Sequence, residues 1–174
     1  NAHGGLISLD DLKNYKTVHT EPIWSEYRGH KVSCGHPPGG GVMMLEMLNI
    51  LEHFDLGSMT HNSADYIAIV AEAMKYATID KDNKMGDPAF DDVPIEDFIS
   101  RHHAAECAKR IKNGEKADVI RFGDPEEAKD TTHVTVVDED GNCVSMTHSL
   151  GMPSGVVSQG MGFMYNGCMG AFDP

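Results

Sequence analysis

The sequence lacks any apolar run that approaches the ~20 residues needed for a helix to cross a bilayer. It also lacks internal repeats and low-complexity segments. The first five residues have neither the basic start nor the apolar core of a secretory signal peptide. Because the protein's true start can lie upstream, the compartment (periplasmic, secreted or cytoplasmic) stays unassigned.

Positive charge is scarce. There are 14 lysines and arginines against 27 aspartates and glutamates, for a formal net charge of -13. Such a balance repels phosphate groups, so it argues against nucleic acids and anionic membranes as partners. The acidic residues are spread along the chain, which is typical of a solvated surface.

Closely spaced cysteines are missing as well. Cys34, Cys107, Cys143 and Cys168 form no C-x-x-C pair, which argues against a disulfide framework and a cysteine zinc site. Cys107 and Cys143 lie in apolar patterns and are predicted to be small core residues. The sequence has no G-x-S-x-G or H-E-x-x-H motif either, and nothing in it predicts a cofactor or a bound metal.

The 174 residues, 40% of them hydrophobic, suffice for a domain with a real core. Apolar spacing of three and four residues predicts helices within residues 1–115. A turn signal at Arg28-Gly29-His30 predicts an early hairpin. Residues 115–130 are polar and predict an exposed loop. The expected helices are a short one over 8–15, one after the loop at 36–41, one from about Ser63, and one from near Pro94 to 113–114.

Strand-like sequence follows Thr131, and Asp140-Gly141 is a strong hairpin turn signal within 131–150. A two-residue loop there places Thr132 opposite Ser149 and His133 opposite His148. One further strand is expected around residues 162–165. Helices followed by strands, without βαβ alternation, predict an α+β fold.

Thr131 is a candidate nucleophile with an unusual source of base. An N-terminal threonine can use its own α-amino group, with an ordinary pKa of ~7.7–8.0, to take the hydroxyl proton. That amine exists only after the Asp130–Thr131 bond is cut. On spacing alone, two threonines at a strand start are explained better by β propensity.

The segment Asp130–Asn142 resembles the start of the small subunit in the γ-glutamyltranspeptidase family. There, a Thr-Thr-His run beginning with the nucleophile leads into a Val-Val-Asp-x-x-Gly-Asn turn. Further matches occur in the family's order along most of the chain. They are Tyr27-Arg28-Gly29, Pro37–Gly41, Leu48–Leu51, Ala71–Lys75 with Ala77 and Asp80, and Gly86-Asp87-Pro88.

The resemblance implies an N-terminal-nucleophile hydrolase with an αββα sandwich, which moves a γ-glutamyl group from an amide such as glutathione to water or an acceptor amino acid. Thr131 is then the nucleophile, freed by autocleavage after Asp130. Ser149 falls where the family usually has a threonine that hydrogen-bonds the nucleophile. Residues 1–130 would end the large-subunit region, mostly helical, and residues 131–174 would begin the small-subunit region.

The sequence also departs from the family pattern. Gly151, Cys168 and Ala171 stand where well-known members have substrate-binding asparagine, Gln or Glu, and an aspartate that pairs with the substrate ammonium. The chain therefore resembles divergent members. The family precursor is several times longer, so the chain is expected to be a fragment. A substrate-binding arginine is expected upstream, and the oxyanion hole beyond Pro174.

Two alternatives remain open. One is a related acylase with a different amide substrate. The other is an inactive fragment that acts as a structural or oligomerising module, as a homodimer or with the missing parts of the precursor. Among the histidines, His133 and His148 are predicted to be a surface pair rather than a metal site, and His102-His103 to lie on the exposed face of a helix.

Overall fold

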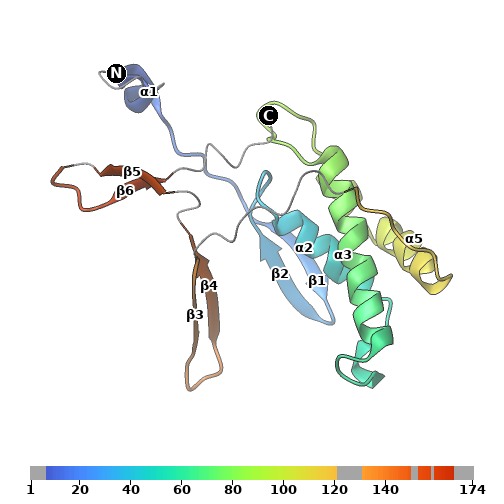
Figure 1. Ribbon diagram of the computed structural model, residues 1–174. Coiled ribbons are helices and arrows are strands. Elements are labelled where there is room, and N and C mark those ends of the chain that lie inside the picture. Colours follow the sequence, from blue (N-terminus) through green and yellow to red (C-terminus); the bar gives the residue numbers. More distant parts are fainter. Residues whose placement is uncertain (1–6, 121–130, 150–152, 158, 167–174) are drawn as a thin grey trace. The chain divides into compact units, whose positions relative to one another are not determined.

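The computed structural model describes residues 7–120, 131–149, 153–157 and 159–166 of the chain. The chain divides into two compact units, Asn1–Arg121 and Phe122–Pro174. Helices dominate the first unit, and antiparallel strands make up the described part of the second (Figure 1). The predicted α+β class is confirmed, with helices before residue 115 and a hairpin within 131–150.

The first unit combines one β-hairpin with a group of helices. Among the described helices, none has the length and apolarity needed to span a membrane. In chain order the elements are α1 Leu9–Asn14, β1 Ile23–Tyr27, β2 His30–Cys34, α2 Gly41–Leu51, the 3-10 helix η1 Leu56–Ser58, α3 Ala64–Lys84, α4 Ile95–Phe98 and α5 Arg101–Lys112.

The β1–β2 hairpin turns on two residues with positive φ. Arg28 has φ 51° and Gly29 has φ 79°, and Tyr27 pairs with His30 across the turn. Two successive positive φ values define the turn type whose twist matches that of the flanking strands. The hairpin predicted at Arg28-Gly29-His30 is therefore confirmed.

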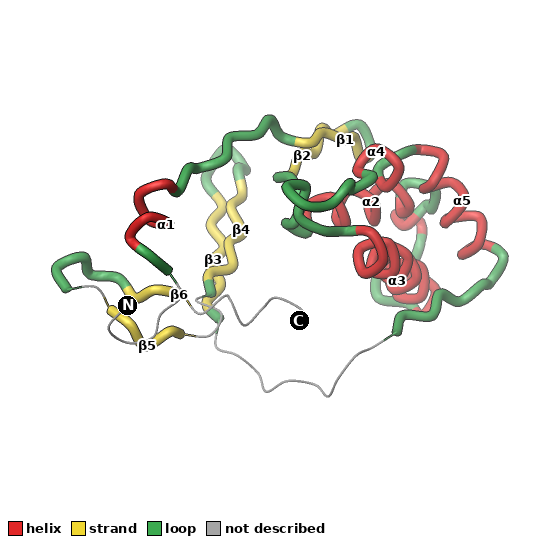
Figure 2. The backbone as a smooth tube through the Cα atoms, turned by 90° about the horizontal axis from the view of Figure 1, so that it is seen from above, coloured by secondary structure: helices red, strands yellow, loops and turns green. Residues whose placement is uncertain are grey.

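The core of the first unit lies where α3 and α5 pack against α2. Both views show these helices side by side (Figures 1 and 2). Most of the buried side chains at the contacts are small, which lets the helix backbones approach closely. Cys107 is among them, so its prediction as a core residue is confirmed. The buried cluster consists of Ile50, Ala73, Tyr76, Ala104, Cys107, Ala108 and Ala117.

The helix expected from Pro94 onward is broken at Ser100. The Ser100 hydroxyl accepts the backbone N–H of His103 at 3.1 Å and so caps α5. Asn49, buried on α2, donates to the carbonyl of Ile99 at 2.9 Å and accepts from the Ser25 hydroxyl on β1 at 3.1 Å. One buried amide thus ties both the hairpin and the α4–α5 junction to α2.

A second buried polar side chain, Glu72 on α3, holds the segment after α5. Its Oε2 accepts the backbone N–H of Ala117 at 2.8 Å, and its Oε1 accepts from the Lys75 ammonium at 2.9 Å. A buried carboxylate is costly unless it is paired and hydrogen-bonded. Glu72 meets both conditions, so it fixes the 113–117 segment against α3.

The described part of the second unit contains two hairpins in separate sheets. β3 Thr132–Val137 pairs with β4 Cys143–His148, and β5 Pro153–Val157 pairs with β6 Met164–Asn166. The strand expected near 162–165 is present as β6, whereas β5 is an addition. Its interior Gly155 weakens the strand pattern, because glycine is a poor strand former.

Cys143, at the start of β4, is exposed among the described residues. Its prediction as a core residue is therefore wrong for this part of the chain. The reason is that every residue of β3 and β4 is exposed in this two-stranded sheet. Alternating apolar residues indicate which side chains share one face of a strand, but they do not show what packs against that face.

We expect Glu72→Ala to lower the free energy of unfolding of the first unit by about 1–3 kcal/mol, because the buried N–H of Ala117 loses its acceptor. Denaturant titration followed by circular dichroism measures the change. Glu106→Ala, at an exposed position of α5, is the control and should change the free energy by less than about 0.5 kcal/mol. Equal stability of Glu72→Ala and the wild type would contradict the assignment.

Candidate active site

The β3–β4 hairpin closes on a turn at residues 138–142. The Asp138 carboxylate accepts the backbone N–H groups of Asp140 and Asn142 at 3.0 and 2.8 Å, and the Asn142 side-chain amide at 2.7 Å. The bond from the Asn142 side chain is the main cause that lowers the pKa of Asp138. Gly141 has φ 84°, which a residue with a Cβ rarely adopts. The turn therefore has an acceptor for its backbone N–H groups in Asp138 and a glycine at its left-handed position.

The register differs by one residue from the predicted one. Thr132 lies opposite His148, and His133 lies opposite Thr147. The pairing predicted from a two-residue loop at Asp140-Gly141 is therefore wrong. The Asp138 N–H donates to the Asn142 carbonyl at 3.0 Å, so three residues separate the closing pair. A three-residue loop with a left-handed glycine at its end is also a common hairpin form.

The corrected register places Ser149 opposite Thr131, one residue beyond the last printed pair on each strand. The Thr131 hydroxyl donates to the Ser149 hydroxyl at 3.4 Å, which is a long hydrogen bond. Both side chains are exposed among the described residues. The structure thus brings these two predicted site residues together, while their roles remain predictions.

One face of the hairpin is lined with hydroxyl groups and an imidazole. Side chains alternate across a strand, so Thr131 shares its face with His133 and Thr135. The His133 ring is hydrogen-bonded through Nδ1 to the Thr147 hydroxyl at 2.8 Å, and through Nε2 to those of Ser145 and Thr135 at 3.0 and 3.2 Å. The sequence signal for this network, which was not predicted, is a polar residue at every second position of 131–135 and of 145–149.

The opposite face carries His148 and Thr132 together with apolar side chains. His148 does not lie opposite His133, so that predicted pairing is wrong for the same reason of register. The two histidines point to different faces of the sheet. The apolar members of this face, all exposed among the described residues, are Val134, Val136, Val144 and Met146.

The family model for gamma-glutamyltranspeptidase matches residues 1–174. The chain belongs to the γ-glutamyltranspeptidase family.

The relatives of this chain include proteins named glutathione hydrolase and proteins named acylase. It is 39% identical to the glutathione hydrolase proenzyme of Escherichia coli, over 98% of this chain and 30% of that protein. It is 39% identical to the acylase ACY 1 proenzyme of Pseudomonas sp. strain SE83, over 99% of this chain and 32% of the relative. The chain therefore spans about a third of the length of these relatives.

A solved structure shows the same fold. The cephalosporin acylase from Bacillus halodurans matches with a TM-score of 0.67 and 31% identity, over 95% of this chain and 30% of the other. The predicted fold of part of an N-terminal-nucleophile hydrolase agrees with this match.

Four of the predicted site residues lie outside the described residues. They are Asp130, which precedes the proposed nucleophile, and the three positions named from family resemblance, Gly151, Cys168 and Ala171. Their assignments remain predictions that the described geometry does not test.

A second group of ionisable side chains lies in the helical unit. His103 on α5 contacts Glu46 on α2 and Asp80 on α3, with both carboxylates 2.9 Å from its Nε2. The prediction that His103 lies on an exposed helix face is therefore wrong, because it is partly buried between helices. The one sequence signal was Glu46, a carboxylate within the apolar pattern of Gly41–Leu51.

His103 and Asp80 stabilise each other's charged form. The hydrogen bond with Asp80, with smaller contributions from Cys107 and Glu46, raises the pKa of His103 to about 12. The hydrogen bond from His103 lowers the pKa of Asp80. Burial raises the pKa of Glu46. Opposite charges on His103 and Asp80 therefore meet between three helices of the same unit.

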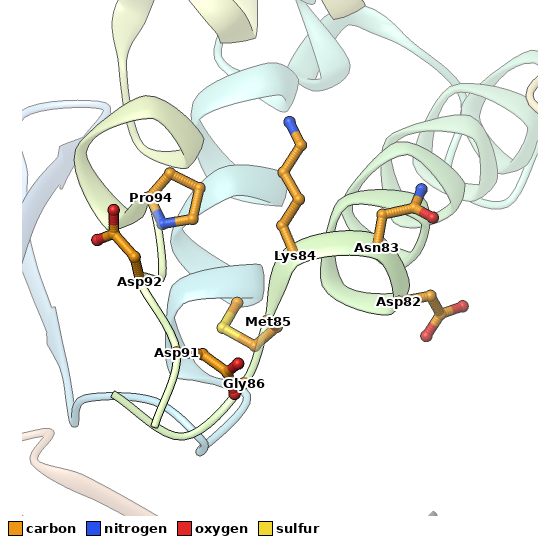
Figure 3. Close-up of a pocket in the computed structure, with 8 residues that line it drawn as sticks. All are labelled: Asp82, Asn83, Lys84, Met85, Gly86, Asp91, Asp92 and Pro94. Carbon is orange, nitrogen blue, oxygen red and sulfur yellow. The ribbon is translucent and has the colours of Figure 1, made fainter. Parts of the chain in front are cut away.

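A pocket of about 400 Å³ opens beside the end of α3 (Figure 3). Asp82, Asp91 and Asp92 contribute carboxylates to its lining. The ammonium of Lys84 points away from Asp91 in Figure 3 and lies 3.9 Å from Asp80 Oδ1. The pocket is acidic and open, and no second feature of the described residues points to a ligand there.

We expect Gly141→Ala to loosen the β3–β4 hairpin, because a left-handed conformation costs a residue with a Cβ about 1–2 kcal/mol. Amide hydrogen exchange of the cross-strand N–H groups should speed up about 5–30-fold in an opening equilibrium. Glu139→Ala, in the same turn, is the control and should exchange like the wild type. Unchanged exchange in Gly141→Ala would rule out this role for the glycine.

Proposed function

We propose that the protein to which this chain belongs cleaves an amide bond through an acyl ester on Thr131. The substrate is a γ-glutamyl compound such as glutathione, and the acyl group passes to water or to an acceptor amine. The observation that carries the proposal is the Thr131–Ser149 hydroxyl pair at the open end of the hairpin, at 3.4 Å, in a chain of this family.

The proposed chemistry needs a free amine on Thr131. We infer that the Asp130–Thr131 bond is cut, so that residues 1–130 end one subunit and residues 131–174 begin another. Before cleavage the Thr131 hydroxyl attacks the carbonyl of Asp130, and water hydrolyses the resulting ester. The word "proenzyme" in the names of the relatives supports such processing.

Turnover then follows a balanced sequence of proton transfers. The α-amine takes the Thr131 hydroxyl proton as Oγ1 attacks the substrate carbonyl, and it returns a proton to the departing amine. The acyl group stays on Oγ1 as an ester. A water molecule, deprotonated by the same amine, attacks the ester carbonyl. The amine then returns that proton to Oγ1, and the acyl group leaves as a carboxylic acid. Ser149 holds Thr131 Oγ1 in place throughout.

The name of the Escherichia coli relative, a glutathione hydrolase, supports glutathione as substrate. A second candidate is supported by relatives named acylases, the ACY 1 proenzyme and the Bacillus halodurans cephalosporin acylase. We assign Gly151, Cys168 and Ala171 to substrate binding by their position in the family pattern. Alanine at position 171 offers no carboxylate to a glutamyl ammonium, which favours an acyl group without that ammonium.

Thr131→Ala in the full-length protein should abolish both cleavage after Asp130 and amide hydrolysis, because it removes the attacking oxygen. Intact mass spectrometry shows whether two fragments form, and release of the amine product measures turnover. Thr132→Ala is the matched control, since Thr132 faces the other side of the hairpin, and it should still be processed. Processing or turnover in Thr131→Ala would contradict the proposal.

A panel of γ-glutamyl and glutaryl amides separates the two substrate classes. Preference for γ-glutamyl amides supports the first candidate, and preference for glutaryl amides supports the acylase. An unprocessed full-length chain that forms concentration-dependent oligomers and hydrolyses neither class would instead support a structural module.

Ser149→Ala should lower kcat about 2–13-fold with little change in KM, because one hydrogen bond to the nucleophile contributes about 0.5–1.5 kcal/mol. Ser149→Thr keeps the hydroxyl and should stay within about threefold of the wild type. Steady-state kinetics of both processed variants measure the effect. If Ser149→Thr loses as much as Ser149→Ala, the hydroxyl is not the feature that matters.

A further inference from the structure

Three helices of the first unit each direct one metal-binding type of side chain to the same point. Glu46 comes from α2, Asp80 from α3 and His103 from α5. His103 Nε2 lies 2.9 Å from Glu46 Oε1 and 2.9 Å from Asp80 Oδ2. The three ligand atoms all lie within 4.8 Å of one another.

One imidazole nitrogen faces two carboxylate oxygens in this cluster. A protonated imidazole nitrogen has one N–H, which makes one well-directed hydrogen bond. Two carboxylate oxygens at equal distance therefore have to share it. Glu46 is only 1% exposed, so its carboxylate interacts with protein groups and not with bulk water. A small cation at the centre would satisfy both carboxylates at once.

We propose that Glu46, Asp80 and His103 form a binding site for a zinc ion. Zinc takes imidazole nitrogen and carboxylate oxygen at about 2.0–2.2 Å in tetrahedral geometry. Tetrahedral ligands at those distances stand about 3.3–3.6 Å apart, so the nitrogen–oxygen distances have to widen by about half an ångström. Binding displaces the proton from His103 Nε2, and the two carboxylates then balance the two charges of the ion.

The surroundings favour zinc over magnesium or calcium. Those harder ions prefer an all-oxygen shell, whereas imidazole suits zinc. The sulfur of Cys107, one helical turn after His103, lies 3.6 Å from Nε2 and adds a soft atom to the neighbourhood. The side chains of Asp80 and His103 are 17% and 30% exposed. The site therefore has an open side from which an ion and a water molecule can enter.

Neighbouring charge supports one particular mode of binding. The Lys84 ammonium lies 3.9 Å from Asp80 Oδ1, the oxygen that does not face His103. Asp80 therefore offers Oδ2 alone to the ion. Because each ligand belongs to a different helix, zinc would join α2, α3 and α5 and stabilise the first unit. None of the three ligands takes part in the chemistry proposed for Thr131.

Calorimetric titration of the chelator-treated protein with zinc chloride tests the proposal. We expect one ion per chain, a rise in melting temperature with zinc, and no heat with magnesium chloride. Glu46→Gln and His103→Gln should weaken zinc binding by more than about 100-fold, since losing even a hydrogen-bond partner of a ligand costs about 10–100-fold. Circular dichroism without metal checks that each variant is folded.

Glu52→Gln is the matched control. Glu52 lies directly after α2 and pairs with Arg101 of α5, so the change removes an interhelical carboxylate outside the cluster. It should bind zinc like the wild type. Absence of binding by the wild type, or equal binding by Glu46→Gln and His103→Gln, would overturn the proposal. If those variants do not fold, anomalous diffraction from zinc-soaked wild-type crystals decides, by a peak at the cluster or elsewhere.

Discussion

The buried face of α2 is the constraint on which the helical unit depends. It carries apolar side chains such as Leu45 and Ile50, but also Glu46 and Asn49. Apolar burial is non-directional, whereas a buried polar group needs a partner at a defined position. Asn49 finds Ser25 of β1 and the backbone beside α5, and Glu46 finds His103. The placement of α5 and β1 against α2 is therefore set by hydrogen bonds as much as by packing.

The β3–β4 hairpin solves a different problem. The pairing of two strands fixes which residues lie opposite each other, and so it brings the hydroxyl groups of Thr131 and Ser149 together. The hydrogen bonds of Asp138 with Asn142 set the register at the turn. At the other end of the strands, that register places Thr131 beside Ser149. Alternation along both strands places most of the hydroxyl groups on one face and most of the apolar side chains on the other.

Local sequence signals predicted much of this structure. The Arg28-Gly29 turn and the helical periodicity rest on residues that are close together in the sequence. The nearness of Thr131 to Ser149 was expected from the family resemblance, although the register predicted for the hairpin was wrong by one residue. The failures share a cause. The hydrogen bonds of Asp138 decide the length of the loop between β3 and β4. The helix break at Ser100 is stabilised by the Ser100 cap of α5 and by the hydrogen bond from Asn49 of α2 to the carbonyl of Ile99. An Asp-Gly pair or an apolar pattern alone does not distinguish these outcomes.

The sequence by itself determined the α+β class, the family resemblance and the position of the candidate nucleophile, because these depend on residue order and spacing. Only the tertiary structure decided that Glu46, Asp80 and His103 meet. These residues are widely separated in the chain, and their spacing follows no motif. Their convergence depends on how closely α2, α3 and α5 pack, which small side chains such as Ala73 and Ala104 allow. Packing of that kind is a property of several helices together and is not encoded in any one of them.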